Sequence, residues 1–157
     1  METGEKFVVL LRHGIAHPRG TKPEEERDLT PIGHQRMREV ARGLANLFPK
    51  AGALVSSPLL RCIQTAEWVE KSYGGKLAIE TRDELRPEGD RAAFRTLIDS
   101  IHARRIIIVG HEPYLSEAIQ LPDLELKKGG CYGVRITADA MRLEWMLPPR
   151  ALRRLRA

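Results

Sequence analysis

The sequence predicts a three-layer α/β/α sandwich whose central sheet is mostly parallel and has an antiparallel edge. Three observations lead to this α/β fold class. Strand and helix patterns alternate along the chain, the earlier strands are continuous apolar runs, and the last two strand patterns alternate apolar and polar residues. Continuous apolar strands are typical of a parallel sheet that is covered by helices on both faces. The alternating final pair indicates a hairpin at the sheet edge.

Two strand–helix units make up the first half of the chain. The apolar run at residues 7–11 predicts a strand, and Thr30 followed by proline predicts the capped start of a helix. The apolar face of this helix consists of Met37, Val40, Leu44 and Leu47 or Phe48. Residues 53–55 predict a second strand, and Ser57 followed by proline repeats the helix-start signal. The buried stripe of the second helix consists of Leu59, Ile63, Ala66 and Val69.

The second half continues the alternation. Residues 77–79 predict a weak strand, and Asp90 can cap a helix. The apolar stripe of that helix consists of Phe94, Leu97, Ile98 and Ile101. Residues 106–109 give the strongest strand signal, and Pro113 then opens a short helix with its apolar residues turned inward. The edge hairpin is expected around residues 132–136 and 142–147.

The composition is that of one globular domain over residues 1–157, with 42% hydrophobic and 30% charged residues. A net charge of +5 raises the question of nucleic acid. Acidic and basic residues are mostly interspersed, as in residues 22–27, so we do not expect a nucleic-acid partner. The basic excess lies in the C-terminal tail at about residues 150–157. We expect this tail to be solvated, with a contact to a phosphate backbone or a partner as the alternative.

Two features bear on the cellular compartment. The N-terminal residues do not form a signal peptide, and no apolar stretch reaches the length of a membrane span, so no membrane partner is expected. Cys62 and Cys131 lie far apart without the spacing of a metal site. We expect both to be buried free thiols, which fits a cytoplasmic protein.

Three of the predicted strands end in residues suited to phosphate chemistry. The first ends in Arg12 and His13, the second is followed by a helix carrying Arg61, and the strongest ends at His111. Because open α/β sheets bind ligands outside the carboxyl ends of their strands, these four side chains should converge. Arginine binds phosphate oxygens bidentately, and a neutral imidazole is a competent nucleophile. His111 can stay cationic and stabilise the transferring oxygens.

The backbone near these residues offers further support for anion binding. Gly14 lets the backbone approach a ligand closely, and a helix that begins at Pro58 directs its N–H groups toward the same place. A metallohydrolase built on the histidines is the weaker interpretation, since no pair of them has ligand spacing and clustered arginines repel a cation. We therefore expect no metal and no other cofactor.

Four stretches resemble, in the same order, the motifs of the histidine phosphatase superfamily, also called the phosphoglycerate-mutase-like superfamily. They are Leu11-Arg12-His13-Gly14, Leu29-Thr30-Pro31-Ile32-Gly33, the segment 56–66 (SSPLLRCIQTA) and Val109-Gly110-His111-Glu112-Pro113. The resemblance runs from about Phe7 to the last strand. It implies a phosphoglycerate-mutase-like fold, with His13 as the nucleophile that becomes phosphohistidine. It also implies that Arg12, Arg61 and His111 form the pocket for the phosphoryl group.

Within the superfamily, the compact chain is most similar to the SixA-type phosphohistidine phosphatases. Arg27 precedes the second motif as in that group, and residues 83–90 (DELRPEGD) resemble its "EL.P.GD" stretch. The chain has no room for the inserted cap that many larger relatives carry. The resemblance implies a phosphorylated protein, carrying phosphohistidine, as the partner and substrate.

The general acid is the point where the sequence departs from the family. Pro87 stands where mutase-like relatives have a glutamate, and Glu84 and Glu88 lie beside it. Glu112 follows His111, where the acid-phosphatase branch has an aspartate, so it is the candidate for a direct catalytic role. The alternative is that each glutamate is a surface or helix N-terminal carboxylate. If Glu112 is the acid, Glu112→Gln should impair alkyl esters more than a phosphohistidine substrate.

Two other functions remain open at this point. The first is a broad phosphomonoesterase acting on a small phosphate ester, such as a sugar or nucleotide phosphate. The second is a phospho-binding module without catalysis, against which the presence of His13 beside the arginines argues.

Overall fold

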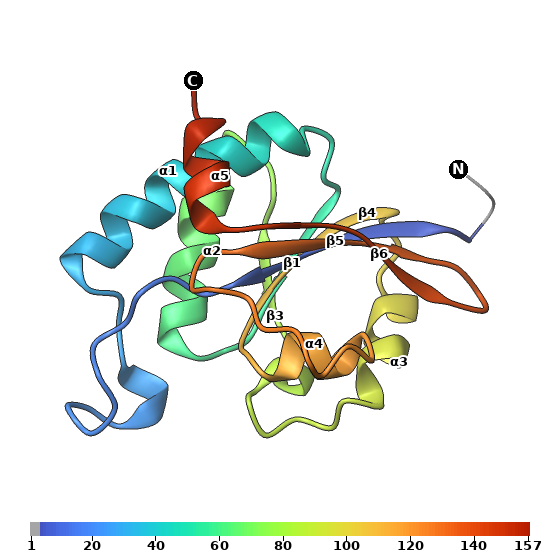
Figure 1. Ribbon diagram of the computed structural model, residues 1–157, viewed down its shortest axis with the longest axis horizontal. Coiled ribbons are helices and arrows are strands. Elements are labelled where there is room, and N and C mark those ends of the chain that lie inside the picture. The colour runs from blue at the N-terminus through green and yellow to red at the C-terminus, as the bar shows by residue number, and fades with distance from the viewer. Residues whose placement is uncertain (1–3) are drawn as a thin grey trace.

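The computed structural model describes residues 4–157, and six strands in it form one sheet in the order β3-β2-β4-β1-β5-β6 (Figure 1). The strands are β1 (Lys6–Arg12), β2 (Ala53–Ser56), β3 (Ile79–Thr81), β4 (Arg105–Gly110), β5 (Cys131–Ile136) and β6 (Met141–Leu147). The neighbours from β3 to β1 are parallel, whereas β5 runs antiparallel to β1 and β6 antiparallel to β5. This confirms the mostly parallel sheet and its antiparallel edge.

Helices cover both faces of the sheet. Figure 1 shows α1, α2 and α5 on one face, and α3 and α4 on the other. Their bounds are α1 (Pro31–Leu47), α2 (Leu60–Ser72), α3 (Ala93–Ser100), α4 (Tyr114–Ala118) and α5 (Pro149–Arg154). Because side chains alternate along a strand, Val8 and Leu10 of β1 pack in the α3–α4 layer, while Val9 and Leu11 pack in the α1–α2 layer. All four are fully buried, as the continuous apolar run predicted.

The first helix begins where the sequence predicts, and the second does not. Thr30 caps α1 by accepting a hydrogen bond from Gly33 N at 3.0 Å. Of the two apolar residues expected at the end of this helix, Phe48 is buried and Leu47 is exposed. The start predicted for α2 at Pro58 is wrong, because the helix begins at Leu60 without a side-chain cap. Its buried face consists of Arg61, Cys62, Thr65, Ala66 and Val69, so the expected Ile63 is not part of it.

Shifts of similar size affect β3 and α3. The strand begins at Ile79, two residues later than predicted. Asp90 is not the N-cap of α3, because the helix begins at Ala93 with Ala92 at the N-cap position. Asp90 Oδ1 instead accepts a hydrogen bond from Ala92 N at 3.0 Å, just before the helix. The apolar stripe of α3 is buried as predicted. The remaining strands and α4 agree with the predicted positions within about two residues.

The C-terminal segment exposes Arg150, Arg154 and Arg156, as expected of a solvated tail, but it also packs against the rest of the fold. It forms α5, whose Leu152 is fully buried against α1. A Cβ atom on Gly43 of α1 would lie only 1.8 Å from the Leu152 carbonyl oxygen, so this glycine is what allows the close approach. Arg153 and Arg156 pair with Glu39 at 3.5 and 3.4 Å. Packing between helices therefore orders this basic segment.

Two further expectations can be compared with the described residues. Cys62 and Cys131 are buried free thiols, as predicted. Among the helices formed by residues 4–157, none is both long enough and apolar enough to cross a membrane.

Candidate active site

The carboxyl ends of β1, β2 and β4 open onto a cavity of about 680 Å³. Its lining includes the five side chains for which the sequence predicted a catalytic role: Arg12, His13, Arg61, His111 and Glu112. They come from three separate segments that the parallel pairing of β1, β4 and β2 brings to one edge. The structure therefore brings these side chains together as the position of the strand ends predicted.

His13 lies directly after β1 and is 6% exposed. Its Nδ1 lies 2.7 Å from the carbonyl oxygen of Gly14, which can only accept, so Nδ1 carries the proton of the neutral ring. The lone pair is then on Nε2, which accepts a hydrogen bond from Arg61 Nε at 3.3 Å. Burial, with the charges of Arg61 and Arg12, lowers the pKa of His13 to about 3. At neutral pH, His13 therefore presents the uncharged imidazole that a nucleophile requires.

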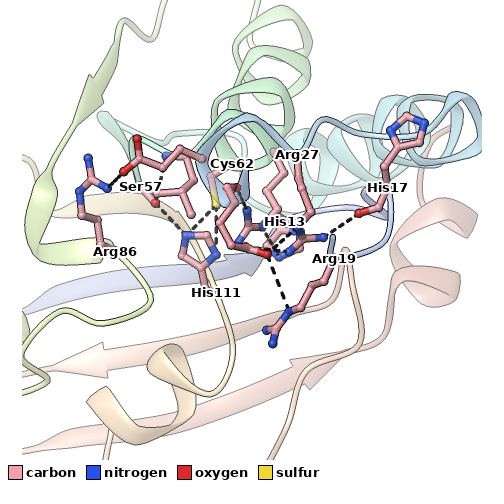
Figure 2. Close-up of polar contacts among 12 residues, drawn as sticks. His13, His17, Arg19, Arg27, Ser57, Cys62, Arg86 and His111 are labelled. Atoms are coloured by element: carbon pink, nitrogen blue, oxygen red, sulfur yellow. Dashed lines mark hydrogen bonds and ion pairs between the residues drawn. The ribbon is translucent and has the colours of Figure 1, made fainter. Parts of the chain in front are cut away.

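His111 lies at the end of β4, and its ring centroid is 5.4 Å from that of His13. Figure 2 shows the ring between Ser57 and Cys62. Its Nε2 lies 2.8 Å from Ser57 Oγ and 3.4 Å from Cys62 Sγ. Burial, together with His13 and the nearby arginines, lowers the pKa of His111 to about 2. With this pKa the ring is uncharged at neutral pH, which differs from the cationic form that the sequence analysis allowed for His111.

Two predicted guanidinium groups differ in their partners. Arg61, the second residue of α2, is 3% exposed and uses its Nη1 and Nη2 atoms to contact Glu24. Arg12 donates from Nη1 to the carbonyl oxygen of Leu126 at 2.5 Å. Its Nε is buried and has no hydrogen-bond partner among residues 4–157. Because a buried, unsatisfied N–H is costly, this donor is well suited to an incoming oxyanion.

Glu24 is a member of the site that sequence reasoning missed. It belongs to a 3₁₀ turn, Glu24–Glu26, in the loop between β1 and α1. One carboxylate oxygen lies 3.1 Å from Arg61 Nη2, and Arg27 binds the carboxylate in bidentate fashion at 2.8 and 3.1 Å. Figure 2 shows Arg27 near His13, whereas the sequence indicated Arg27 only as a feature of the resemblance. The acidic triplet beside a basic motif is the signal that could have indicated this pairing.

Gly14 and the start of α2 act differently from what was expected. A Cβ atom on Gly14 would lie 2.4 Å from Met37 Cγ of α1, so this glycine is needed for packing against a helix. Its carbonyl fixes the His13 ring, and its N–H donates to Thr65 Oγ1 at 3.1 Å. Since α2 begins at Leu60, the serine before Pro58 is free to contact His111 instead of capping the helix.

Glu112 lines the cavity, but its carboxylate is bound by hydrogen-bond donors from two segments. These donors are Ser116 N and Oγ, at 2.8 and 2.6 Å, and Leu126 N at 2.7 Å. Glu112 thus joins the first turn of α4 to the segment before β5.

The other candidate acids lie in different surroundings. Glu84 pairs with Arg82 at 2.6 Å and does not line the cavity. Pro87 and Glu88 do line it, and Glu88 is an exposed residue. Within residues 4–157, no group of three or more His, Cys, Asp or Glu side chains is placed to hold a metal ion.

Comparisons with known proteins agree with this geometry. A family model of the histidine phosphatase superfamily (branch 1) matches residues 8–90, more than half of the chain. An uncharacterized protein of Picosynechococcus sp. is 35% identical over 139 residues, covering 82% of this chain and 84% of that protein.

Solved structures show the same fold at lower sequence identity. The protein histidine phosphatase SixA complexed with tungstate has a TM-score of 0.81 at 22% identity, covering 93% of this chain and 99% of that chain. A phosphoserine phosphatase from Entamoeba histolytica has a TM-score of 0.71 at 15% identity, covering 92% and 98% of the two chains. From the family match over residues 8–90 and the relative at 35% identity, we conclude that the chain belongs to the histidine phosphatase superfamily, branch 1, and is a phosphatase.

Proposed function

We propose that this phosphatase removes phosphate from phosphohistidine in proteins and forms a phosphohistidine at its own His13 in doing so. The observation that carries the proposal is the state of His13. Its ring is buried and neutral, its Nδ1 proton is held by the Gly14 carbonyl, and its Nε2 lone pair lies beside the Arg61 guanidinium. This is the arrangement that nucleophilic attack on a bound phosphoryl group requires.

The reaction then takes two steps at one phosphorus atom. In the first, the Nε2 lone pair of His13 attacks phosphorus, the P–N bond to the substrate imidazole breaks, and the departing nitrogen takes a proton from water. In the second, water attacks the phosphorus on His13, and the P–Nε2 bond breaks with its electrons returning to the ring. The water loses a proton to solvent, and inorganic phosphate is released. No metal takes part in either step.

Three side chains stabilise the phosphoryl group in this proposal. The Nε of Arg12 supplies a buried donor that has no hydrogen-bond partner among residues 4–157. Arg61 supplies a fork once Glu24 releases it. The approach of a phosphate dianion opposes the burial that lowers the pKa of His111, so binding favours proton uptake by this ring. In this proposal, His111 carries the expected positive charge when phosphate is bound.

The choice of a P–N substrate rests on the state of the glutamates around the cavity. An alcohol leaves poorly unless a general acid protonates it, whereas an imidazole leaves more easily. Pro87 lines the cavity where mutase-like relatives have a glutamate. Glu24 is held by arginines, and Glu25 pairs with Arg86 at 2.6 Å. These contacts favour a substrate that does not depend on a well-placed acid.

Glu88 supports a second candidate function. It lines the cavity, and among residues 4–157 it has no hydrogen-bond or ion-pair partner. A free carboxyl at this position is available to protonate a leaving alcohol. The enzyme would then be a phosphomonoesterase for a small ester such as a sugar phosphate.

The test compares kcat/KM for a phosphohistidine peptide and a sugar phosphate in the wild type and in Glu88→Gln. Glu67→Gln, at an exposed glutamate of α2 outside the cavity, is the matched control. We expect the peptide to be strongly preferred and both variants to behave as the wild type. If the sugar phosphate is turned over equally well or better, and Glu88→Gln impairs it selectively, the small-ester function is correct and the phosphohistidine proposal is wrong.

A further inference from the structure

A buried hydrogen-bond network starts at Glu112, the residue after His111. Its Oε1 accepts from Ser116 N at 2.8 Å, and its Oε2 accepts from Ser116 Oγ at 2.6 Å and from Leu126 N at 2.7 Å. Ser116 Oγ also lies 2.6 Å from the hydroxyl of Tyr132 on β5, and both of these residues are fully buried. Because Ser116 donates to the carboxylate, the tyrosine hydroxyl donates to Ser116, and the chain of donors ends on Glu112.

Leu126 connects this network to Arg12. Its N–H donates to Glu112, and its carbonyl oxygen accepts the hydrogen bond from Arg12 Nη1 at 2.5 Å. Leu126 lies in residues 119–130, which form neither helix nor strand, so no regular element fixes its backbone. Its side chain is 1% exposed in the α3–α4 core layer. Leu126 is thus held by Glu112 through its N–H group and holds Arg12 through its carbonyl oxygen.

The Arg12 side chain has little else to orient it. Within residues 4–157, the Leu126 carbonyl is its one hydrogen-bond acceptor, since Nε has none. Its ion pair with Glu125 spans 3.9 Å, and the glutamate side chain is 75% exposed. Exposed ion pairs of this kind contribute little. The position of the guanidinium therefore depends on where the Leu126 carbonyl lies.

We infer that Glu112 is a positioning residue: its carboxylate fixes the backbone of Leu126, and through that backbone it fixes the Arg12 guanidinium at the phosphoryl site. The inference rests on the proposed function, which gives Arg12 its role. It replaces the expectation that Glu112 acts directly as the general acid. A general acid must approach the leaving group, but both oxygens of this carboxylate take part in hydrogen bonds with Ser116 and Leu126 of the protein itself.

The inference predicts a specific kinetic pattern for Glu112→Gln. The amide nitrogen of glutamine cannot accept, so it opposes either Leu126 N or Ser116 N. The first orientation releases Leu126 N directly, and the second pushes the side chain out of the position from which it holds the Leu126 backbone. Misplacement by about 1 Å can cost on the order of 10²-fold in rate, so we expect kcat/KM to fall by about 10–100-fold. The fold-loss should be the same for p-nitrophenyl phosphate, an alkyl phosphate and a phosphohistidine peptide, because Arg12 contacts the group that these substrates share. A loss confined to the alkyl phosphate would show that Glu112 is the acid.

A double-mutant cycle between Glu112→Gln and Arg12→Ala tests the coupling directly. Its readouts are kcat/KM for p-nitrophenyl phosphate and the dissociation constant of tungstate, measured by calorimetry. In the Arg12→Ala background, Glu112→Gln should change either quantity by less than about twofold, since the residue it positions is absent. Equal losses in both backgrounds would overturn the inference.

Two variants complete the design, and circular dichroism and thermal unfolding check the fold of each protein. Glu125→Gln, in the same segment and 3.9 Å from Arg12, should behave as the wild type. If Glu112→Gln does not fold, Glu112→Asp replaces it in the cycle, because it keeps the charge but shortens the reach to Leu126 N. If the wild type binds tungstate and the losses caused by the two substitutions are additive, the inference alone is refuted. A wild type that neither binds tungstate nor hydrolyses any substrate refutes the proposed function, and the inference with it.

Discussion

Glu24 places its carboxylate between the guanidinium groups of Arg61 and Arg27, and Arg61 is one of the groups proposed to bind the incoming phosphate. Its oxygens lie 3.1 Å from Arg61 Nη2 and 2.8 Å from Arg27 Nε, and the Arg27 contact lowers the pKa of the carboxyl. If the phosphoryl group of the substrate binds the Arg61 fork, it must first displace this carboxylate. Glu24→Gln removes the competing charge while keeping nearly the same shape. We therefore expect the variant to bind inorganic phosphate more tightly than the wild type.

The magnitude follows from the exposure of the groups. Ion pairs on the surface are worth about 0.2–1 kcal/mol, whereas hydrogen bonds to charged groups reach about 1.5–3 kcal/mol. The side chain of Glu24 is 50% exposed, but those of Arg61 and Arg27 are only 3% and 10% exposed, so the pairing lies between these limits. A competing interaction of about 1–3 kcal/mol corresponds to roughly 5- to 150-fold in the dissociation constant of phosphate.

Isothermal titration calorimetry with inorganic phosphate measures this change. Glu26→Gln is the matched control, since Glu26 belongs to the same 3₁₀ turn, is exposed and does not line the cavity. Phosphate should bind the control as it binds the wild type. Binding to Glu24→Gln that is unchanged or weaker would refute the reasoning, because Glu24 would then support the arginines and not compete for them.

Two more predictions concern metal and pH. Arg61→Ala should lower kcat/KM on the order of 10²–10³-fold, as deletion of one transition-state donor does. The activity of the wild type should be unaffected by EDTA. Activity that is lost with EDTA and restored by a divalent ion would contradict a metal-independent reaction. The pKa values of His13 and His111, about 3 and about 2, lie below the 6.5 of an unperturbed histidine, so between about pH 6.5 and pH 3 the unfolded chain binds more protons. The melting temperature should therefore fall as the pH is lowered from 7 to 4. The melting temperature of His13→Asn should depend less on pH than that of the wild type. A wild-type melting temperature that is independent of pH in this range would contradict the buried, neutral state of the two histidines.

The strands were predictable because they depend on local sequence, and the convergence of the site residues follows from the parallel order of those strands. Residues 106–109 form a continuous apolar run, and such a run is buried on both faces wherever it lies in a parallel sheet. Once the parallel order is known, the residues that follow each strand must meet at one edge. His13 and His111 therefore came together from nearly 100 residues apart without any knowledge of their contacts.

What the sequence did not predict depends on tertiary contacts. Ser57 and Pro58 have the local chemistry of a helix start, but the serine hydroxyl contacts His111, and α2 begins at Leu60. The basic residues of the C-terminal segment are mostly exposed, as the composition indicates, but composition does not show that Leu152 among them packs against α1. Glu112 is adjacent to His111 in sequence, yet its carboxylate binds Leu126, fourteen residues away. Neither adjacency nor composition contains this information.

The central claim, a covalent phosphohistidine at His13, is tested most directly by trapping the intermediate. The enzyme is mixed with ³²P-labelled substrate and quenched rapidly, and the labelled protein is then digested and mapped. We predict one labelled site, at His13, that is stable in alkali and lost in acid, and no label in a folded His13→Ala variant, which should also be inactive. Label on another residue, or a folded His13→Ala variant with full activity, would contradict the account.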